Sequence, residues 1–583
     1  MHPEPTGRDT GIVREGPLNW GQEMFWHEEV QGAGGCGWSN TACELAVPEG
    51  ASLRDLTDAV ETLVERHESL RTTYRADKPV QVVHAPRPVS LEQLPVSHPE
   101  AVTAVVEEAK ARLTRRRFDL VHEFPLRAAV ALCPVPVSVV LAFNHIALDG
   151  VSLEILTEEL TELLRRRVEG TAQPLAPVTH QPLDQAAYEQ SGQGRKLAAE
   201  ALRYWEEQLT GMPSRVFPAE AASTEQQLYE VVMESEGLSA AAGWLGRRHR
   251  GATAVWLAAF SALLGISTGR DRCAVLTVSA NRLTEATLRA VGCFAQPVPM
   301  TVDLSGDPSF SELVERARLA ATRAYCHGQY AHAEMKALER LHAVRRGVHF
   351  ALLPVFNFQL DGGAANARAF GPAEDPGSPP AVPPREEAPR VKAIAAGGRD
   401  LFVLSVAPGS PACRVMLNCD AATVPYATRF LQGLAALLVG VIDHPDLRLS
   451  QVGALSGVGP PELGPDWALV DNCWVRLPAV AELLREHPGV GAAAATLEPG
   501  DRRSLVAYVA ARGSVPTPAD LREFALEALP ARPAVIAPHR YVVCRQAPDS
   551  PGDLDAWRGQ EVIAEGSGRD GADAPAQAGA RGL

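Results

Sequence analysis

Residues 137–156 read VSVVLAFNHIALDGVSLEIL, and the fold can be worked out from this stretch. The continuous apolar run over residues 137–143 is typical of a strand that is buried on both faces. The dipeptide Asp149-Gly150 then turns the chain, and apolar residues recur at helical spacing over residues 152–167. The stretch therefore predicts a buried strand, a tight connection and a helix.

The polar pair Asn144-His145 lies at the exit of this predicted strand. His145 would be held by a rigid element on each side. Its imidazole has an ordinary pKa of about 6.5, which suits a group that accepts and returns a proton near neutral pH. A lone histidine at a strand end can equally be a structural residue with satisfied hydrogen bonds. From this stretch alone, both interpretations stay open.

The segments around this stretch predict a mixed α/β layered fold. Patterns with helical and with strand spacing alternate along the chain, and a second set continues to about residue 455. In the first part, the expected helices cover residues 52–68, 98–116 and 152–167, and the expected strands cover residues 80–84, 126–132 and 137–143. The Pro- and Gly-rich residues 361–391 predict a surface insertion.

Composition narrows the class of protein. The chain has 583 residues, of which 46% are hydrophobic and 21% charged, so it can build more than one core. A net charge of −15 opposes binding to nucleic-acid phosphates, and we expect no such partner. Residues 251–269 carry no charge, and we interpret them as a buried core helix rather than a membrane span. The ten cysteines lack the spacing of a zinc site, so we expect no metal site. The first residues also lack the pattern of a signal peptide, and together with the scattered cysteines this predicts a cytoplasmic protein.

Several ordered motifs resemble those of condensation domains from nonribosomal peptide synthetases and of the wider superfamily that contains chloramphenicol acetyltransferase. NHIALDG (residues 144–150) is similar to the family signature His-His-x-x-x-Asp-Gly. The other motifs follow in the family's order: PLNWGQEMFW (17–26), RHESLRTTY (66–74), FDLVHEFPLRA (118–128), RYWEEQL (203–209), SANR (279–282), VGCFAQPVP (291–299) and PVFNFQ (354–359). The resemblance covers about residues 17–455.

This resemblance implies an α+β fold with two chloramphenicol-acetyltransferase-like lobes in a V and a central tunnel. The lobes would cover residues 17–180 and 181–455, after a flexible leader of residues 1–16. A phosphopantetheine-bound acyl donor would enter the tunnel from one face, and an acceptor, usually an aminoacyl carrier protein, from the other. No cofactor would be bound permanently, because the carrier proteins deliver the phosphopantetheine.

The resemblance also implies roles for single residues. His145 matches the second histidine of the signature and would act as a general base toward the acceptor, or position it and steady the tetrahedral intermediate. Gly150 joins the catalytic set because it would let the backbone pass close to the reacting atoms. Asp149 matches a buried structural aspartate, and Arg282 is its candidate partner. Asn144 replaces the first histidine and can only support the site, since an amide does not exchange protons near neutral pH.

Residues 466–557 resemble the small C-terminal subdomain of adenylation enzymes. That family would place a nucleotide-binding lysine where this chain has Asp553, and no lysine follows Lys392. We therefore predict a degenerate subdomain without a nucleotide site, and an unrelated small α/β domain is the alternative. A disordered tail is expected over residues 558–583.

Together these features predict an enzyme that joins a carrier-bound acyl or aminoacyl thioester to an amine, or to a hydroxyl, in nonribosomal peptide-type secondary metabolism. The chain contains no carrier motif of the Leu-Gly-Gly-x-Ser kind, so donor and acceptor carrier proteins would act in trans. Two alternatives stay open. One is a non-catalytic docking module that kept the fold, and the other is an acyltransferase that uses coenzyme A thioesters or a soluble acceptor.

Overall fold

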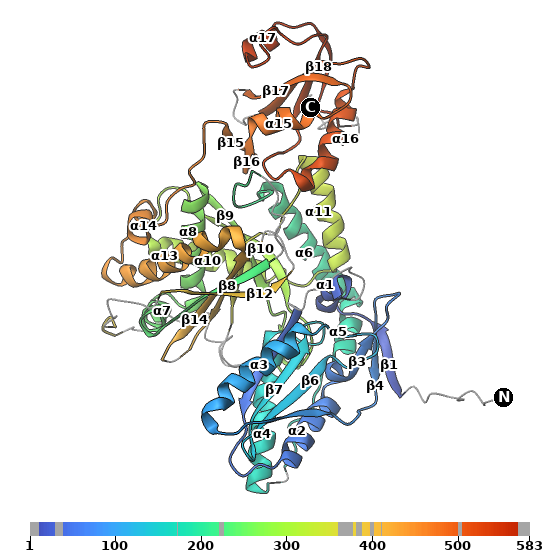
Figure 1. Ribbon diagram of the computed structural model, residues 1–583, viewed down its shortest axis with the longest axis vertical. Coiled ribbons are helices and arrows are strands. Elements are labelled where there is room, and N and C mark those ends of the chain that lie inside the picture. Colours follow the sequence, from blue (N-terminus) through green and yellow to red (C-terminus); the bar gives the residue numbers. More distant parts are fainter. Residues whose placement is uncertain are drawn as a thin grey trace, which may run out of the picture.

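The structure is a computed structural model that describes residues 11–29, 39–171, 173–220, 227–351, 353–359, 377–380, 388–396, 401–409, 411–498 and 504–569. Figure 1 shows three bodies along the long axis: an N-terminal lobe at the bottom, a C-terminal lobe above it, and a smaller C-terminal unit at the top. Each of the two lobes has a β-sheet covered by helices, which confirms the expected α/β class.

The N-terminal lobe is built around a strand that is buried on both faces. Its strands are β1 (Ile12–Pro17), β2 (Asn40–Ala46), β3 (Thr72–Tyr74), β4 (Val80–His84), β5 (Leu91–Pro95), β6 (Leu126–Leu132) and β7 (Pro136–Asn144), and its helices are α2 (Leu53–Arg66), α3 (Val102–Arg115) and α4 (Gly150–Glu169). The main sheet has the order β2-β7-β6-β5, and a smaller sheet has the order β1-β4-β3. In β7, Leu141 and Phe143 pack with α2 and α4, whereas Val140 and Ala142 pack with α3. This two-sided burial explains the continuous apolar run.

The expected elements of this lobe are confirmed. The helix expected over residues 52–68 is α2, and Ser52 caps its N-terminus. The helix expected over residues 98–116 is α3, which a short 3-10 turn precedes. The helix expected over residues 152–167 lies within α4. The three expected strands correspond to β4, β6 and β7.

The C-terminal lobe contains a seven-stranded sheet with the order β10-β9-β11-β13-β14-β8-β12. Its strands are β8 (Gln227–Ser235), β9 (Arg272–Ser279), β10 (Gln296–Asp303), β11 (Val355–Phe358), β12 (Arg390–Ala396), β13 (Phe402–Ala407) and β14 (Cys413–Asp420), and its helices are α7 (Glu236–Arg248), α8 (Ala252–Thr268), α9 (Glu285–Leu288), α10 (Phe310–Tyr325), α13 (Val424–Asp443) and α14 (Leu449–Ser456). Nearly every residue of α8 is buried, as expected for a core helix.

Two helical segments of this lobe are apolar enough to be compared with membrane spans. Within the described residues, 421–443 form a helix of sufficient length and hydropathy, and α7 with α8 would count as a second span only across a bend of 110°. In the structure, α8 and α13 both contribute to the main core of the lobe, where Phe260 contacts Phe430 at a ring distance of 5.7 Å.

Four helices lie where the two lobes meet: α1 (Trp20–Glu29), α5 (Pro182–Glu189), α6 (Gly192–Gly211) and α11 (His332–Arg346). Helix α5 contacts β1, whereas α6 contacts α11 and β10, so the chain passes between the lobes slightly after the expected boundary at residue 181. Helix α1 contacts α11, and the Glu23 carboxylate accepts the backbone N–H of His332 at 3.1 Å.

The C-terminal unit is a separate α/β body that is joined to the C-terminal lobe. It has a hairpin of β15 (Trp467–Val470) and β16 (Cys473–Arg476), a sheet of β17 (Val490–Glu498), β18 (Ser504–Ala511), β19 (Arg540–Cys544) and β20 (Val562–Gly566), and the helices α15 (Leu477–Arg485), α16 (Pro518–Ala528) and α17 (Leu554–Arg558). The Trp474 indole donates to the carbonyl of Thr268 at 2.8 Å, and the Arg522 guanidinium donates to that of Val344 at 2.6 Å. Val348, just after α11, lies in the core of the unit.

Three expected boundaries are wrong at one end. Residues 12–16, which were expected in the flexible leader over residues 1–16, belong to β1, which pairs with β4. Residues 562–566, which were expected in the disordered tail over residues 558–583, belong to β20, which pairs with β19. Arg390 and Val391, which were expected in the insertion over residues 361–391, belong to β12, which pairs with β8.

The three missed strands share a physical cause. Each lies at the edge of its sheet, where a strand has one ladder partner and needs no continuous apolar run. Their composition therefore resembles that of a loop. Within the three expected segments, the structure describes residues 11–16, 377–380, 388–391 and 558–569. Residues 377–380 and 388–389 have no regular structure. The other residues of these segments lie outside the described part of the chain.

Candidate active site

His145 follows directly after β7, and the backbone around it fixes its imidazole. Its N–H donates to the Ser39 carbonyl at 2.8 Å, and its Nδ1 lies 3.0 Å from the Leu148 carbonyl oxygen. A carbonyl oxygen can only accept, so Nδ1 carries the proton and the neutral ring has its lone pair on Nε2. No group within the described residues bonds to Nε2. With respect to the described residues, this atom can therefore accept a proton.

The surroundings of His145 favour the neutral ring. Burial lowers the pKa of His145 below its ordinary value, although the bond to Leu148 and the charge of Asp149 act in the opposite direction. The phenyl ring of Phe25, from α1, stacks on the imidazole with centroids 5.3 Å apart and planes inclined by 8°. His145 as a whole residue is only partly buried. A neutral imidazole can accept a proton at pH 7.

The structure places Asp149 and Arg282 in direct contact, at the border of the two lobes. Their side chains are 4% and 1% exposed, and two bonds of 2.7 Å join the guanidinium to the carboxylate oxygens. Asp149 also caps α4 by accepting the N–H of Ser152 at 3.0 Å, and it accepts the N–H groups of Phe294 and Ala295 at 3.0 and 3.1 Å. Both carboxylate oxygens are thus fully used.

These contacts make Asp149 a structural anion. Burial alone would raise the pKa of Asp149, but the charge of Arg282 and the hydrogen bonds outweigh it and lower that pKa. The carboxylate stays ionised at neutral pH and has no capacity left for a substrate. It joins the start of α4 to the segment after β9.

Asn281 and Ser152 belong to this site, although the sequence did not single them out. Asn281 has a positive φ of 54°, and its amide donates to the carbonyls of Phe294 and Gly328, each at 2.8 Å. The Ser152 hydroxyl lies 2.8 Å from the Gly292 carbonyl and also accepts from Arg282. The sequence offers two weak signals for them: Asn281 directly precedes Arg282 in the SANR motif, and Ser152 follows Asp149 by three residues.

Asn144 and Gly150 lie on either side of His145 and differ in their surroundings. Asn144 is fully buried, donates to the Asn40 side chain at 2.9 Å and accepts the N–H of Ile146 at 3.0 Å. It stabilises the turn that carries His145. Gly150 is exposed at the start of α4, and a Cβ there would meet no atom of the described residues within 4 Å. Packing among these residues therefore does not require a glycine at this position.

The histidine of the RHESLRTTY motif is not a second base. His67 is fully buried, and its Nε2 lies 2.8 Å from the Glu159 carboxylate, which also binds Arg66. Burial would raise the pKa of Glu159, but His67 and Arg66 hold it at about 2. This cluster joins α2 to α4.

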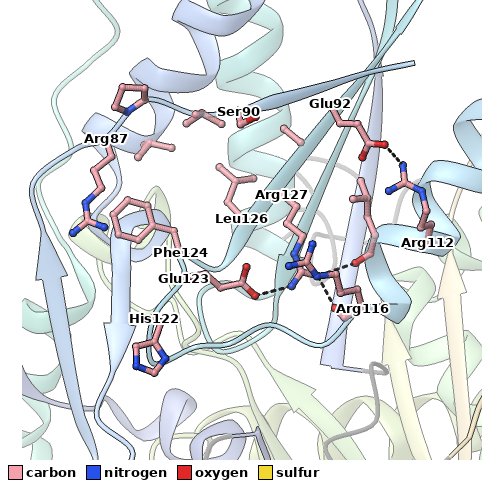
Figure 2. A pocket seen from close by; sticks show the side chains of 15 residues that line it. Arg87, Ser90, Glu92, Arg112, Arg116, His122, Glu123, Phe124, Leu126 and Arg127 are labelled. Atoms are coloured by element: carbon pink, nitrogen blue, oxygen red, sulfur yellow. Dashed lines mark hydrogen bonds and ion pairs between the residues drawn. The ribbon is translucent and has the colours of Figure 1, made fainter. Parts of the chain in front are cut away.

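A separate cavity of about 450 Å³ opens beside the segment before β6 (Figure 2). Among its charged side chains, Arg112 is paired with Glu92, and Arg127 with Glu123. The Arg127 guanidinium also donates to carbonyls at the end of α3. His145 does not line this cavity. The paired charges therefore stabilise the lobe beside the site rather than forming part of it.

Two α/β lobes that meet beside a histidine-bearing loop are the arrangement expected of a chloramphenicol-acetyltransferase-like fold. Within this class, a family described as "Condensation domain" matches residues 14–376. The chain belongs to the condensation-domain family. The match ends before the C-terminal unit, whose resemblance to adenylation enzymes stays a prediction.

Known relatives support this assignment. The chain is 30% identical over 330 residues to one of the linear gramicidin synthase proteins of Brevibacillus parabrevis, and this match covers 53% of this chain and 6% of that protein. It is also 30% identical over 331 residues to phosphinothricin tripeptide synthetase PhsB of Streptomyces viridochromogenes, where the match covers 53% of this chain and 27% of that protein. The chain thus spans only a small part of these much longer relatives.

Solved structures show the same fold. The condensation domain of the monacolin K polyketide synthase MokA superposes with a TM-score of 0.59 at 19% identity, over 75% of this chain and all of that one. The X-domain from teicoplanin biosynthesis superposes with a TM-score of 0.53 at 20% identity, over 74% of this chain and 96% of that one.

Proposed function

We propose that this chain joins an acyl thioester, carried on the phosphopantetheine arm of a carrier protein, to an amine or hydroxyl acceptor. The observation that carries the proposal is the His145 imidazole, whose Nδ1 is bonded to Leu148 at 3.0 Å and whose Nε2 is left to accept a proton. Both carrier proteins would act in trans, and the phosphopantetheine would come with them.

In the proposed reaction, the acceptor nitrogen attacks the thioester carbonyl carbon and forms the new C–N bond. Nε2 of His145 accepts the N–H proton, or orients the nitrogen through the same hydrogen bond. The C–S bond then breaks, and the thiolate of the phosphopantetheine arm leaves and takes up the proton. Asp149 and Arg282 take no part in these transfers, because both carboxylate oxygens and both terminal guanidinium nitrogens bond to each other and to neighbouring groups.

A docking module is the second candidate function. Asn144 stands where the family signature has its first histidine, and both of its side-chain groups are already bonded, the amide to Asn40 in β2 and the oxygen to Ile146 in the turn. The X-domain of teicoplanin biosynthesis has the same fold and has been solved in a complex with OxyB. A chain of this kind would bind a partner protein and transfer no acyl group.

The test incubates the purified chain with an aminoacyl-loaded donor carrier and an aminoacyl-loaded acceptor carrier, and detects the dipeptidyl product by mass spectrometry. A coenzyme A thioester replaces the donor in one arm, and a free amino acid replaces the acceptor in another. His145→Ala should lower the rate by about 10²-fold or more while the thermal unfolding midpoint stays unchanged. Full activity of the folded variant would refute the catalytic role, and carrier binding without product in any arm would indicate a docking module.

For the C-terminal unit we infer a degenerate adenylation-type subdomain without a nucleotide site. Asp553 supports this inference, because its carboxylate accepts the N–H groups of Asp555 and Ala556 at 3.0 and 3.4 Å and so caps α17. A carboxylate in this position would repel nucleotide phosphates rather than bind them.

A further inference from the structure

The imidazole of His145 has two restraints of different kinds. The bond from Nδ1 to the Leu148 carbonyl fixes one edge of the ring, but it leaves the ring free to rock about that bond. The phenyl ring of Phe25 lies nearly parallel to the imidazole, inclined by 8° at a centroid distance of 5.3 Å. A flat neighbour on one face limits the rocking, and it also excludes water from that face.

Phe25 cannot easily move away, because α1 is fastened on several sides. The Trp26 indole donates to the Arg75 carbonyl at 3.0 Å, and the Gln22 amide donates to the Gln81 side chain at 3.2 Å. On another side of the helix, a Cβ at Gly21 would lie 2.3 Å from the Cys293 carbonyl oxygen, so the two backbones are in contact there. The position of Phe25 is therefore set by the packing of the whole helix.

We propose that Phe25 is a positioning residue for His145, whose ring holds the imidazole plane so that Nε2 faces the acceptor. Its effect on turnover rests on the proposed function, whereas its effect on the imidazole can be measured without any substrate. Tyr74 and Cys293 lie in the same apolar cluster as Phe25.

Burial affects the protonation of His145 more than the charged and titratable groups around it do. Asp149 is the charged neighbour, and Arg282 compensates it. Burial raises the pKa of Tyr74 and of Cys293, so both are neutral near pH 7. Removing the Phe25 ring would admit water to the imidazole and reduce the main cause of the lowered pKa of His145.

The first experiment measures the His145 imidazole by NMR in the full chain with labelled histidine, and a His145→Gln sample identifies its signals. We expect Phe25→Ala to raise the pKa of His145 toward its ordinary value and Phe25→Tyr to leave it unchanged. Phe118→Leu is the matched control, because Phe118 belongs to the same apolar cluster but faces the Arg127 guanidinium at 3.7 Å. It should leave the His145 signals as they are.

The second experiment measures turnover with the loaded carriers described above. Phe25→Leu keeps an apolar side chain but loses the flat face, and should lower kcat by about 2- to 10-fold with little change in KM. Phe25→Tyr should retain activity, and so should Phe118→Leu. The proposal is overturned if Phe25→Ala and Phe25→Leu leave the pKa and tautomer of His145 unchanged, or if Phe118→Leu reproduces their effects. If the parent chain forms no product, the proposed function fails, and the NMR result alone decides the role of Phe25.

Discussion

Asp149→Ala should destabilise the junction of the two lobes strongly. The carboxylate and the Arg282 guanidinium are almost fully buried and are joined by two bonds of 2.7 Å. Removing one partner of a buried pair leaves the other charge unpaired, which costs about 3–5 kcal/mol. The variant also loses the cap of α4, which adds about 1 kcal/mol. Arg282 cannot lose its proton, so its charge stays buried.

The opposite change, Arg282→Met, should be less costly. Asp149 would keep four donors, namely the N–H and hydroxyl of Ser152 and the N–H groups of Phe294 and Ala295. A carboxylate can also take up a proton when its partner is absent. The double variant should recover part of the loss of Asp149→Ala, because it leaves no unpaired charge.

The assay is thermal and denaturant unfolding of the full chain, together with hydrogen exchange over residues 280–296. Glu158→Ala is the matched control, since Glu158 also joins α4 to the segment after β9 by an ion pair, to Arg289 at 2.6 Å. That pair is about half exposed, so its loss should change the unfolding free energy by no more than about 1 kcal/mol. Equal unfolding midpoints for Asp149→Ala and Glu158→Ala would refute the reasoning.

Three further predictions concern other parts of the chain. Gly150→Ala should keep or slightly raise the unfolding midpoint, since a Cβ there meets no atom of the described residues within 4 Å. It should lower turnover if a substrate passes close to the backbone, and unchanged turnover would exclude Gly150 from the site. Burial raises the pKa of Glu189 to about 8, so the folded state holds its proton more tightly than the unfolded chain and stability should fall as pH rises from about 4.3 to about 8. Glu189→Gln should flatten this fall in midpoints measured from pH 5 to 9, and parallel curves would contradict it. Finally, neither the chain nor its Asp553→Lys variant should catalyse amino-acid-dependent pyrophosphate exchange, and exchange by either protein would overturn the view of the C-terminal unit.

The central part of the fold could be predicted because its signals are local. The run over residues 137–143 is apolar on both faces since β7 has helices on both sides, and Asp149 lies at the position where a helix cap is needed. The pairing of Asp149 with Arg282 required the family resemblance as well, because nothing in the sequence between them links the two residues.

The stacking of Phe25 and the bonds of Asn281 could not be predicted in this way. Phe25 meets His145 only because α1 packs against the loop after β7, and its residue type would suit any apolar core. Asn281 bonds to backbone carbonyls, which every residue possesses. The same holds for the C-terminal unit, where Trp474 and Arg522 donate to carbonyls of the C-terminal lobe. Contacts of this kind leave no pattern of residue types in the sequence.

The position of the proton-accepting atom also bears on how the lobes can move. His145 is fixed within the N-terminal lobe by β7 and Leu148, whereas Asp149, close behind it, is bonded to Arg282 and Phe294 of the other lobe. Separation of the lobes at this point would break a buried ion pair. The contact of Glu23 with the first N–H of α11 is weaker, because burial raises the pKa of Glu23 to about 7 and its carboxyl is partly protonated near neutral pH. The lobes should therefore separate more easily between α1 and α11 than at Asp149.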